Sequence, residues 1–212
     1  MSITFLHTSH THIQRFNDIV HKIIPDYVVN HIVNETLLED AIKAGEVNKA
    51  GFAEQIKAIT ADTTDKIIFT CSTYGVLCDD YQHVFRIDGP IAELIVTKYK
   101  SVGIAYTAVT TRDSSMNLIT DTGKRLNQSI LIKEIDCSHC WTYFEQGDIE
   151  KYESEIALKI RTDYDGEEVI FLSQASMQGA KRSPLIADLN IVSSAEYGVA
   201  YLIETLSDRV AE

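Results

Sequence analysis

The chain has 212 residues, 45% of them hydrophobic, which is enough to fill the core of one large domain or two small ones. Its formal net charge of −12 disfavours nucleic acid and anionic membrane surfaces as partners, so we expect a small-molecule ligand. The N-terminus has no basic region followed by an apolar stretch, and no window approaches the roughly 18 apolar residues of a membrane span, so we expect a cytoplasmic protein.

Short apolar runs bounded by turn residues recur along the chain and alternate with helical patterns. They occupy residues 3–6, 27–33, 67–70, 84–87, 102–106, 130–135 and 169–172. Continuous apolar strands that alternate with helices are typical of parallel sheets covered by helices. The sequence therefore predicts an α/β fold of the doubly wound kind, with largely parallel sheets.

Several helix starts can be recognised from their first residues. Asp88-Gly89-Pro90 predicts one helix start, and Asp148 precedes a helical stripe of apolar residues. The turn after Thr70 predicts a helix over residues 76–81. Ser193-Ser194-Ala195-Glu196 resembles a capping box that opens a C-terminal helix, with Val210 near the end of its apolar face.

No linker rich in proline or glycine divides the chain, so we place its boundary where a helix ends and a strand begins, near residues 100–102. The first lobe then contains residues 1–100 and, if the C-terminal helix returns to it, residues 193–212. The second lobe contains residues 101–192. A cleft between two such lobes is the expected site.

Cys71 follows the apolar run at residues 66–70, in a Cys-Ser-Thr-Tyr-Gly turn. In open α/β sheets, ligands bind at the carboxyl ends of the strands, which places this thiol for chemistry. If the turn leads directly into a helix, its free N–H groups lower the thiol pKa from about 8.5 towards roughly 3.5 to 7.5. The alternative is a buried structural cysteine.

A comparable turn, Ser-Gln-Ala-Ser-Met, follows residues 169–172, but it carries Gln174 and no cysteine. Hydroxyl groups surround the two turns in the predicted topology. Together with backbone N–H groups, these hydroxyls could bind a carboxylate without any lysine or arginine. The alternative is that each hydroxyl is an ordinary helix cap. These residues are Ser72, Thr73, Thr107, Thr110 and Thr111.

The sequence resembles the cofactor-independent aspartate/glutamate racemase superfamily, which also contains hydantoin racemases, maleate isomerases and arylmalonate decarboxylases. The matching segments span nearly the whole chain, at residues 6–8, 31–38, 71–75, 85–88, 107–111, 147–148 and 172–177. The resemblance implies two pseudo-symmetric α/β lobes, each placing one cysteine on one side of the substrate's stereocentre. It implies neither a cofactor nor a metal.

By this resemblance Cys71 is the first of the two cysteines, and Ser72 and Thr73 hold the substrate carboxylate. Gln174 stands where the second cysteine would be. The resemblance assigns the remaining carboxylate-binding hydroxyls and turn residues to Thr8, Thr107, Thr110, Thr111 and Ser176. It also implies a small carboxylate or dicarboxylate substrate and a homo-oligomer, a dimer or larger.

Glutamine has no titratable proton at neutral pH, so a symmetric racemisation by two thiols is excluded here. Three alternatives follow. Cys71 transfers a proton on one face of the substrate, as in a decarboxylase or an isomerase. Or Cys71 acts as a nucleophile, for example by adding to an activated double bond. Or the protein is catalytically idle and binds a carboxylate in the same cleft.

Two other clusters have simpler interpretations. Cys137 and Cys140 are spaced like half of a zinc or redox motif, but no second ligand pair has comparable spacing, and the aromatic residues that follow favour packing. His7 could contact a ligand in the cleft. We interpret His10 and His12 as solvated residues at the start of a helix.

Overall fold

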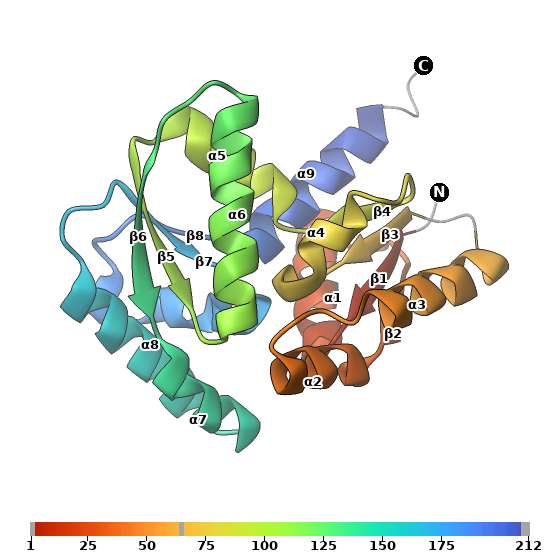
Figure 1. The fold of residues 1–212 in the computed structure, drawn as a ribbon, viewed down its shortest axis with the longest axis horizontal. Helices are drawn as coiled ribbons and strands as arrows, with labels where there is room; N and C mark the ends of the chain where they lie inside the picture. Colours follow the sequence, from red (N-terminus) through yellow and green to blue (C-terminus); the bar gives the residue numbers. More distant parts are fainter. Residues whose placement is uncertain (1–2, 64–65, 209–212) are drawn as a thin grey trace.

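The computed structural model describes residues 3–63 and 66–208, and it contains two four-stranded sheets, one in each lobe (Figure 1). The strand orders are β2-β1-β3-β4 and β6-β5-β7-β8, and every pairing is parallel. The two orders are the same once the second lobe is renumbered. The predicted α/β fold class is therefore confirmed.

The first sheet and its helices come from the N-terminal half. Its elements are β1 (Ile3–His7), α1 (Thr11–Ile23), β2 (Val29–Val33), α2 (Glu35–Ala44), α3 (Lys49–Asp62), β3 (Lys66–Phe69), the 3₁₀ turn η1 (Ser72–Tyr74), α4 (Gly75–Cys78), β4 (Val84–Arg86) and α5 (Gly89–Lys98).

The second sheet follows at once. Its elements are β5 (Ser101–Tyr106), α6 (Val109–Arg125), β6 (Leu131–Asp136), η2 (Ser138–Cys140), α7 (Trp141–Glu145), α8 (Ile149–Asp163), β7 (Val169–Leu172), η3 (Ala175–Arg182), η4 (Pro184–Ile186) and β8 (Ile191–Ser193). The chain then forms the long helix α9 (Ser194–Asp208). The boundaries predicted for the two lobes remain a proposal.

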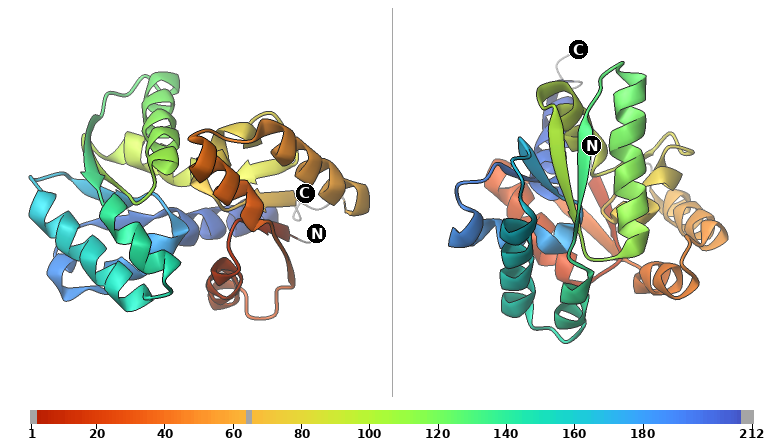
Figure 2. Two further views of the ribbon diagram at one scale, coloured as in Figure 1. Left: turned by 60° about the horizontal axis from the view of Figure 1, so that its bottom comes forward. Right: turned by 60° about the vertical axis from the view of Figure 1, so that its left-hand side comes forward.

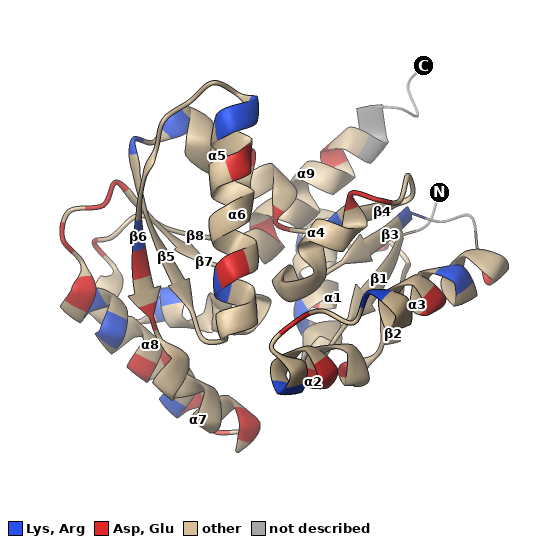
Figure 3. Ribbon diagram, in the orientation of Figure 1, with Lys and Arg blue, Asp and Glu red and all other residues tan. Residues whose placement is uncertain are grey.

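The central strands are buried along almost their whole length because helices cover both faces of each sheet. β1 and β7 are buried throughout, and β3 and β5 are buried after their first residue, as expected for central parallel strands. Strands β2 and β6 lie at sheet edges and are only partly buried, so the predicted continuous burial is wrong for them. Charged side chains gather on helices, loops and the edge strand β6 (Figure 3).

Two of the predicted helix boundaries agree with the structure and two differ. The Asp148 side chain caps α8 by accepting from the Lys151 N–H at 3.1 Å. Helix α5 begins at Gly89 with proline in its first turn. Helix α4, predicted to reach residue 81, ends at Cys78. Ser193 ends strand β8 and its buried hydroxyl has no hydrogen-bond partner, so the predicted capping box does not form.

Helix α9 runs from the second lobe alongside the first, where it contacts α1 and α5 (Figures 1 and 2). Its residues Ala195, Val199 and Ile203 share one hydrophobic cluster with Phe5 and Phe16 of the first lobe. Gly198 allows close approach, because a Cβ atom there would collide with the backbone carbonyl of Ile87. Val210, predicted on the same face, lies outside the described residues.

Within the described residues, no helix combines the length and apolar character that crossing a membrane requires.

Candidate active site

A small, partly open cavity of about 30 Å³ lies where the turn after β3 meets the turn after β7. Its wall contains Cys71, with hydroxyl, amide and imidazole groups around it, and no lysine, arginine, aspartate or glutamate. Leu38, Trp141 and Phe144 form its apolar side, and the rings of Trp141 and Phe144 stack at 4.9 Å. A volume of this size holds about one water molecule, so a carboxylate substrate needs the pocket to open.

Cys71 is 9% exposed and directly precedes the 3₁₀ turn η1. The Thr8 hydroxyl lies beside its sulfur and has no other hydrogen-bond partner. The backbone N–H groups of Thr73 and Tyr74 also point towards the sulfur. The thiol therefore lies at the start of a helical segment, as the sequence predicts.

Burial nevertheless raises the pKa of the Cys71 thiol above its ordinary value. The Thr8 hydroxyl and the N–H groups of Thr73 and Tyr74 favour the thiolate, but one 3₁₀ turn and the four-residue helix α4 do not outweigh desolvation. The lowered pKa expected from the sequence is therefore wrong for this pocket. At neutral pH the sulfur carries its proton.

Cys71 and Gln174 occupy equivalent places in the two lobes. In the first lobe the Thr70 backbone N–H and hydroxyl both donate to the Leu6 carbonyl, at 3.1 and 3.2 Å. In the second lobe Ser173 donates in the same way to the Ala105 carbonyl, at 3.1 and 2.7 Å. Cys71 and Gln174 each follow directly after these residues.

The polar groups of the second lobe bond to one another. The Gln174 side-chain oxygen accepts from the Thr107 N–H at 2.7 Å and from the Thr107 hydroxyl at 2.9 Å. The Thr107 hydroxyl also lies 3.2 Å from the Tyr152 hydroxyl, which lies 3.0 Å from that of Ser176. These hydrogen bonds hold the Gln174 side-chain amide in place. The hydroxyls of Thr107 and Ser176 take part in them and so support the amide.

In the first lobe, buried histidines lie behind the Cys71 turn. His7 Nδ1 bonds to the Thr70 hydroxyl at 2.8 Å, and His7 Nε2 bonds to His31 Nδ1 at 2.8 Å. His31 Nε2 continues the chain to the Asn17 side-chain oxygen at 3.0 Å. Burial is the main cause that lowers the pKa of His7 to about 2, and the neighbouring His12 and His31 lower it further. His7 is neutral and supports Thr70, and it is not part of the cavity wall.

His12, expected to be solvated, is instead 7% exposed and forms part of the cavity wall. Burial, followed by the charge of Arg15, lowers its pKa to about 3. One sequence signal indicated this burial. His12, Phe16 and Val20 are spaced four apart and form the buried face of α1.

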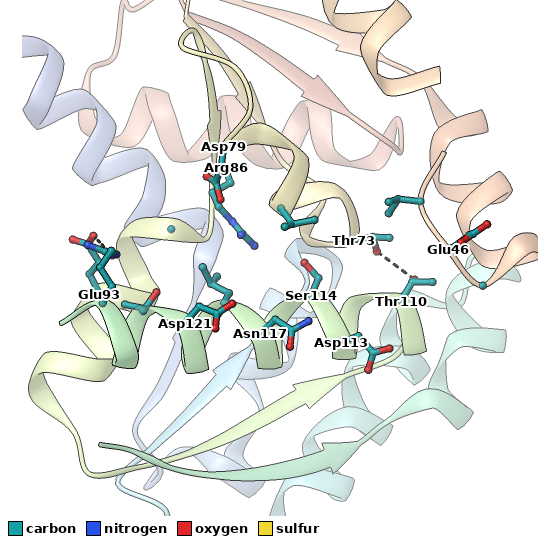
Figure 4. Close-up of a pocket in the computed structure, with 17 residues that line it drawn as sticks. Glu46, Thr73, Asp79, Arg86, Glu93, Thr110, Asp113, Ser114, Asn117 and Asp121 are labelled. Carbon is teal, nitrogen blue, oxygen red and sulfur yellow. Dashed lines mark hydrogen bonds and ion pairs between the residues drawn. The ribbon is translucent and has the colours of Figure 1, made fainter. Parts of the chain in front are cut away.

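A larger groove of about 690 Å³ lies between α6, α4 and the loop before α3 (Figure 4). Thr73 belongs to both the groove and the cavity, and its hydroxyl lies 3.4 Å from that of Thr110 and 3.0 Å from that of Thr111. Arg86 and several carboxylates line the groove, but no cysteine or histidine does. A cysteine and a histidine side chain lie in the wall of the smaller cavity instead.

The cavity brings together most of the residues singled out in the sequence. Its wall includes Thr8, Cys71, Ser72, Thr73, Thr111, Gln174 and Ser176. Thr107 bonds to Gln174, and Thr110 lies on the groove side of Thr73. Cys137 and Cys140 are buried in a hydrophobic core of the second lobe, beside Tyr152 and Ile156. In the described part of the chain, no group of three or more His, Cys, Asp or Glu side chains is arranged to hold a metal.

Comparison with solved structures identifies the architecture. An aspartate racemase from Picrophilus torridus superposes with a TM-score of 0.73 at 15% identity, covering 96% of this chain and 93% of that one. The chain has the fold of the aspartate/glutamate racemase superfamily. A glutamate racemase from Bacillus anthracis gives a TM-score of 0.72 at 15% identity, with 98% and 82% of the two chains covered.

An allantoin racemase from Klebsiella pneumoniae shares the racemase fold too, with a TM-score of 0.64 at 15% identity over 98% of this chain and 88% of that one. No protein-family model matches the sequence, and no curated protein does. At these identities the likeness concerns the fold, as the sequence resemblance predicted.

Proposed function

We propose that this protein is a cofactor-independent isomerase of the racemase type, which acts on a small carboxylate through the single thiol of Cys71. The observation that carries the proposal is the position of Cys71: it faces the cavity between the two lobes, and its counterpart is an amide. The racemase fold of the solved structures supports the reaction class.

The protonation state of Cys71 suits proton donation. Because burial raises its pKa, the resting group is a thiol, which can protonate the carbanion left at the α-carbon when the substrate loses CO₂ or gives its α-proton to a base on the other face. In this step the S–H bond breaks, a C–H bond forms, and the thiolate remains. The thiolate then regains a proton from water or from the α-carbon of the next substrate.

The substrate carboxylate is held by neutral groups. Hydroxyls of Thr8, Thr73 and Thr111 and backbone N–H groups of the η1 turn surround the cavity, and no cation does. Such donors stabilise the negative charge that spreads onto the carboxylate as the α-carbon becomes a carbanion. Gln174 contributes its amide NH₂ group, because Thr107 already holds its oxygen.

The apolar side of the cavity favours a substrate with an apolar side chain over a dicarboxylate. Leu38, Trp141 and Phe144 line that side, and the cavity wall contains no lysine or arginine to pair with a second carboxylate. Decarboxylation of a substituted malonate uses the same protonation step, and addition of the Cys71 thiolate to an activated double bond is the nucleophilic variant.

Deuterium exchange tests the proposal. The protein is incubated in D₂O with both enantiomers of aspartate, glutamate and phenylalanine, and separately with phenylmalonate and maleate. Mass spectrometry then follows deuterium at the α-carbon, or product. We expect activity with at least one of these compounds, and Cys71→Ala to abolish product formation or the exchange of at least one enantiomer. The matched control is Cys78→Ala, because Cys78 is buried in the core of the same lobe and does not face the cavity. Activity that survives Cys71→Ala unchanged contradicts the role of the thiol.

The second candidate is a catalytically idle carboxylate-binding protein. The small volume of the cavity and the amide at position 174 favour it. It predicts that one of the same carboxylates raises the melting temperature while no compound exchanges deuterium or reacts.

Two further properties belong to this proposal. All four cysteines are free thiols and buried, which supports a reducing compartment such as the cytoplasm. We also propose a homo-oligomer, a dimer or larger, which light scattering during gel filtration would measure.

A further inference from the structure

His12 is the buried titratable side chain of the cavity that the proposed function leaves without a role. It lies in the first turn of α1, is 7% exposed, and shares the cavity wall with Cys71 and Gln174. Its buried Nδ1 atom has no hydrogen-bond partner. His7, the neighbouring buried histidine, bonds through both ring nitrogens.

An unpartnered nitrogen in a buried imidazole is costly, because the nitrogen has lost its water and gained no protein partner. Such a group in the wall of a cavity is explained when a ligand completes its hydrogen bonding. The Thr8 hydroxyl, also in the wall, has only the Cys71 sulfur beside it. Both groups come from the segment after β1. The buried polar atoms of the cavity wall that lack a hydrogen-bond partner therefore lie on the first lobe.

The orientation of α1 places His12 beside the turn that carries Gln174. Arg15 follows His12 by three residues on the same face of α1, and its guanidinium donates to the carbonyl of Ala175. The cavity wall that contains His12 also includes Thr70 and Cys71. The imidazole of His12 and the thiol of Cys71 therefore line one and the same cavity.

We propose that His12 is the second proton-transfer residue of this pocket and supplies the titratable group that Gln174 cannot. This inference rests on the proposed function. In one direction the imidazole of His12 removes the α-proton: the C–H bond breaks, an N–H bond forms, and the electron pair moves into the carboxylate. The Cys71 thiol then donates its proton to the carbon, which leaves an imidazolium and a thiolate.

The pocket resets by moving one proton from the imidazolium to the thiolate, directly or through one water molecule. Burial favours the neutral form of both groups, so this return is downhill. During the reaction, the negative charge of the substrate carboxylate stabilises the imidazolium. The two bases differ in chemistry, in contrast to a symmetric pair of thiols.

Exchange measured separately for each enantiomer tests the inference. The experiment compares wild type with His12→Asn and Cys71→Ala, using the enantiomer pairs of aspartate, glutamate and phenylalanine in D₂O. We expect His12→Asn to slow exchange at least about a hundredfold for one enantiomer of the active pair, and Cys71→Ala to do so for the other. His10→Asn is the matched control, since it makes the same change two residues earlier at an exposed position.

A second variant separates chemistry from folding. In His12→Ala, added imidazole is expected to restore part of the lost exchange, and for the same enantiomer only. Melting temperatures of all variants identify any that fail to fold. A wild type that is inactive with every compound, phenylmalonate and maleate included, overturns the proposed function and this inference together. A wild type that converts phenylmalonate or maleate but exchanges neither enantiomer of any pair overturns only this inference. A wild type that exchanges, with His12→Asn unchanged for both enantiomers, overturns only the role of His12.

Discussion

The Ser72 hydroxyl donates a hydrogen bond of 2.7 Å to the backbone carbonyl of Ser173, a residue 101 positions later in the chain. The Ser114 hydroxyl in turn donates to the Ser72 carbonyl at 2.5 Å. Ser72, which follows Cys71, is therefore hydrogen-bonded to the second lobe through both its hydroxyl and its carbonyl. In this structure the Ser72 hydroxyl, expected to bind a carboxylate, is already used for this contact.

Removing that hydroxyl is expected to weaken the contact between the lobes. Ser72→Ala leaves the buried Ser173 carbonyl without this donor, so we expect the free energy of unfolding to fall by about 1–3 kcal/mol. Urea unfolding measures it. Ser154→Ala is the control, because Ser154 is exposed and bonds only within its own helix, and its effect should stay within about 0.5 kcal/mol. Equal effects of the two substitutions would contradict the structural role of Ser72.

Gln174 is expected to be structural as well as part of the site. Gln174→Ala leaves the Thr107 N–H without its acceptor and should lower the free energy of unfolding by about 1–3 kcal/mol. Gln174→Glu keeps an oxygen in the same place and should recover much of the loss. Chemical denaturation of the three proteins at pH 7 checks this order. A glutamate variant no more stable than the alanine variant would show that the hydrogen bonds to Thr107 contribute little.

Cys71 is expected to react slowly with alkylating reagents in the free protein. Because burial raises its pKa, the thiolate fraction at pH 7 is small and grows about tenfold per pH unit until the pH approaches that pKa. Iodoacetamide labelling from pH 7 to 9, with the labelled peptide identified by mass spectrometry, measures this. The reference is free cysteine under the same conditions. Labelling of Cys71 faster than this reference at pH 7 would mean that the pocket opens to an activated thiolate.

The buried histidines are expected to make the protein sensitive to mild acid. The pKa is about 2 for His7 and about 3 for His12 in the folded protein, against an ordinary value of 6.5. Below pH 6.5 the unfolded chain therefore binds protons that the folded protein does not, and stability falls as the pH falls. Each histidine contributes up to about 1.4 kcal/mol per pH unit.

Urea unfolding at pH 7, 6 and 5 covers a range in which most carboxylates stay ionised. His12→Asn should reduce the slope of stability against pH, because it removes a ring whose pKa burial lowers. A wild-type free energy of unfolding that is constant from pH 7 to 5 would contradict neutral burial of these rings.

The fold was predictable because its signals are local. Continuous apolar runs mark the central strands, and Asp148 marks a helix start that the structure confirms. Strand β8 escaped notice because it has three residues and leads directly into α9. The helix predicted over residues 76–81 stops at Cys78 because the chain turns there to enter β4.

The candidate site was less predictable, since burial depends on contacts between distant segments. The sequence indicates that Cys71 precedes a helical turn and that Thr111 lies near it, but not that Trp141 and Phe144 of the second lobe help to enclose it. The same holds for His12. Its spacing with Phe16 and Val20 marks a buried face, yet only the folded chain places that face against the turn at Ala175.

Because α9 returns to the first lobe, the packing of that lobe cannot be completed until the second sheet has been synthesised. Ala195, Val199 and Ile203 cover apolar side chains of β1 and α1, which leave the ribosome far earlier. That part of the first sheet stays uncovered while the entire second sheet is translated. The nascent chain therefore exposes these apolar side chains to water until α9 has been synthesised.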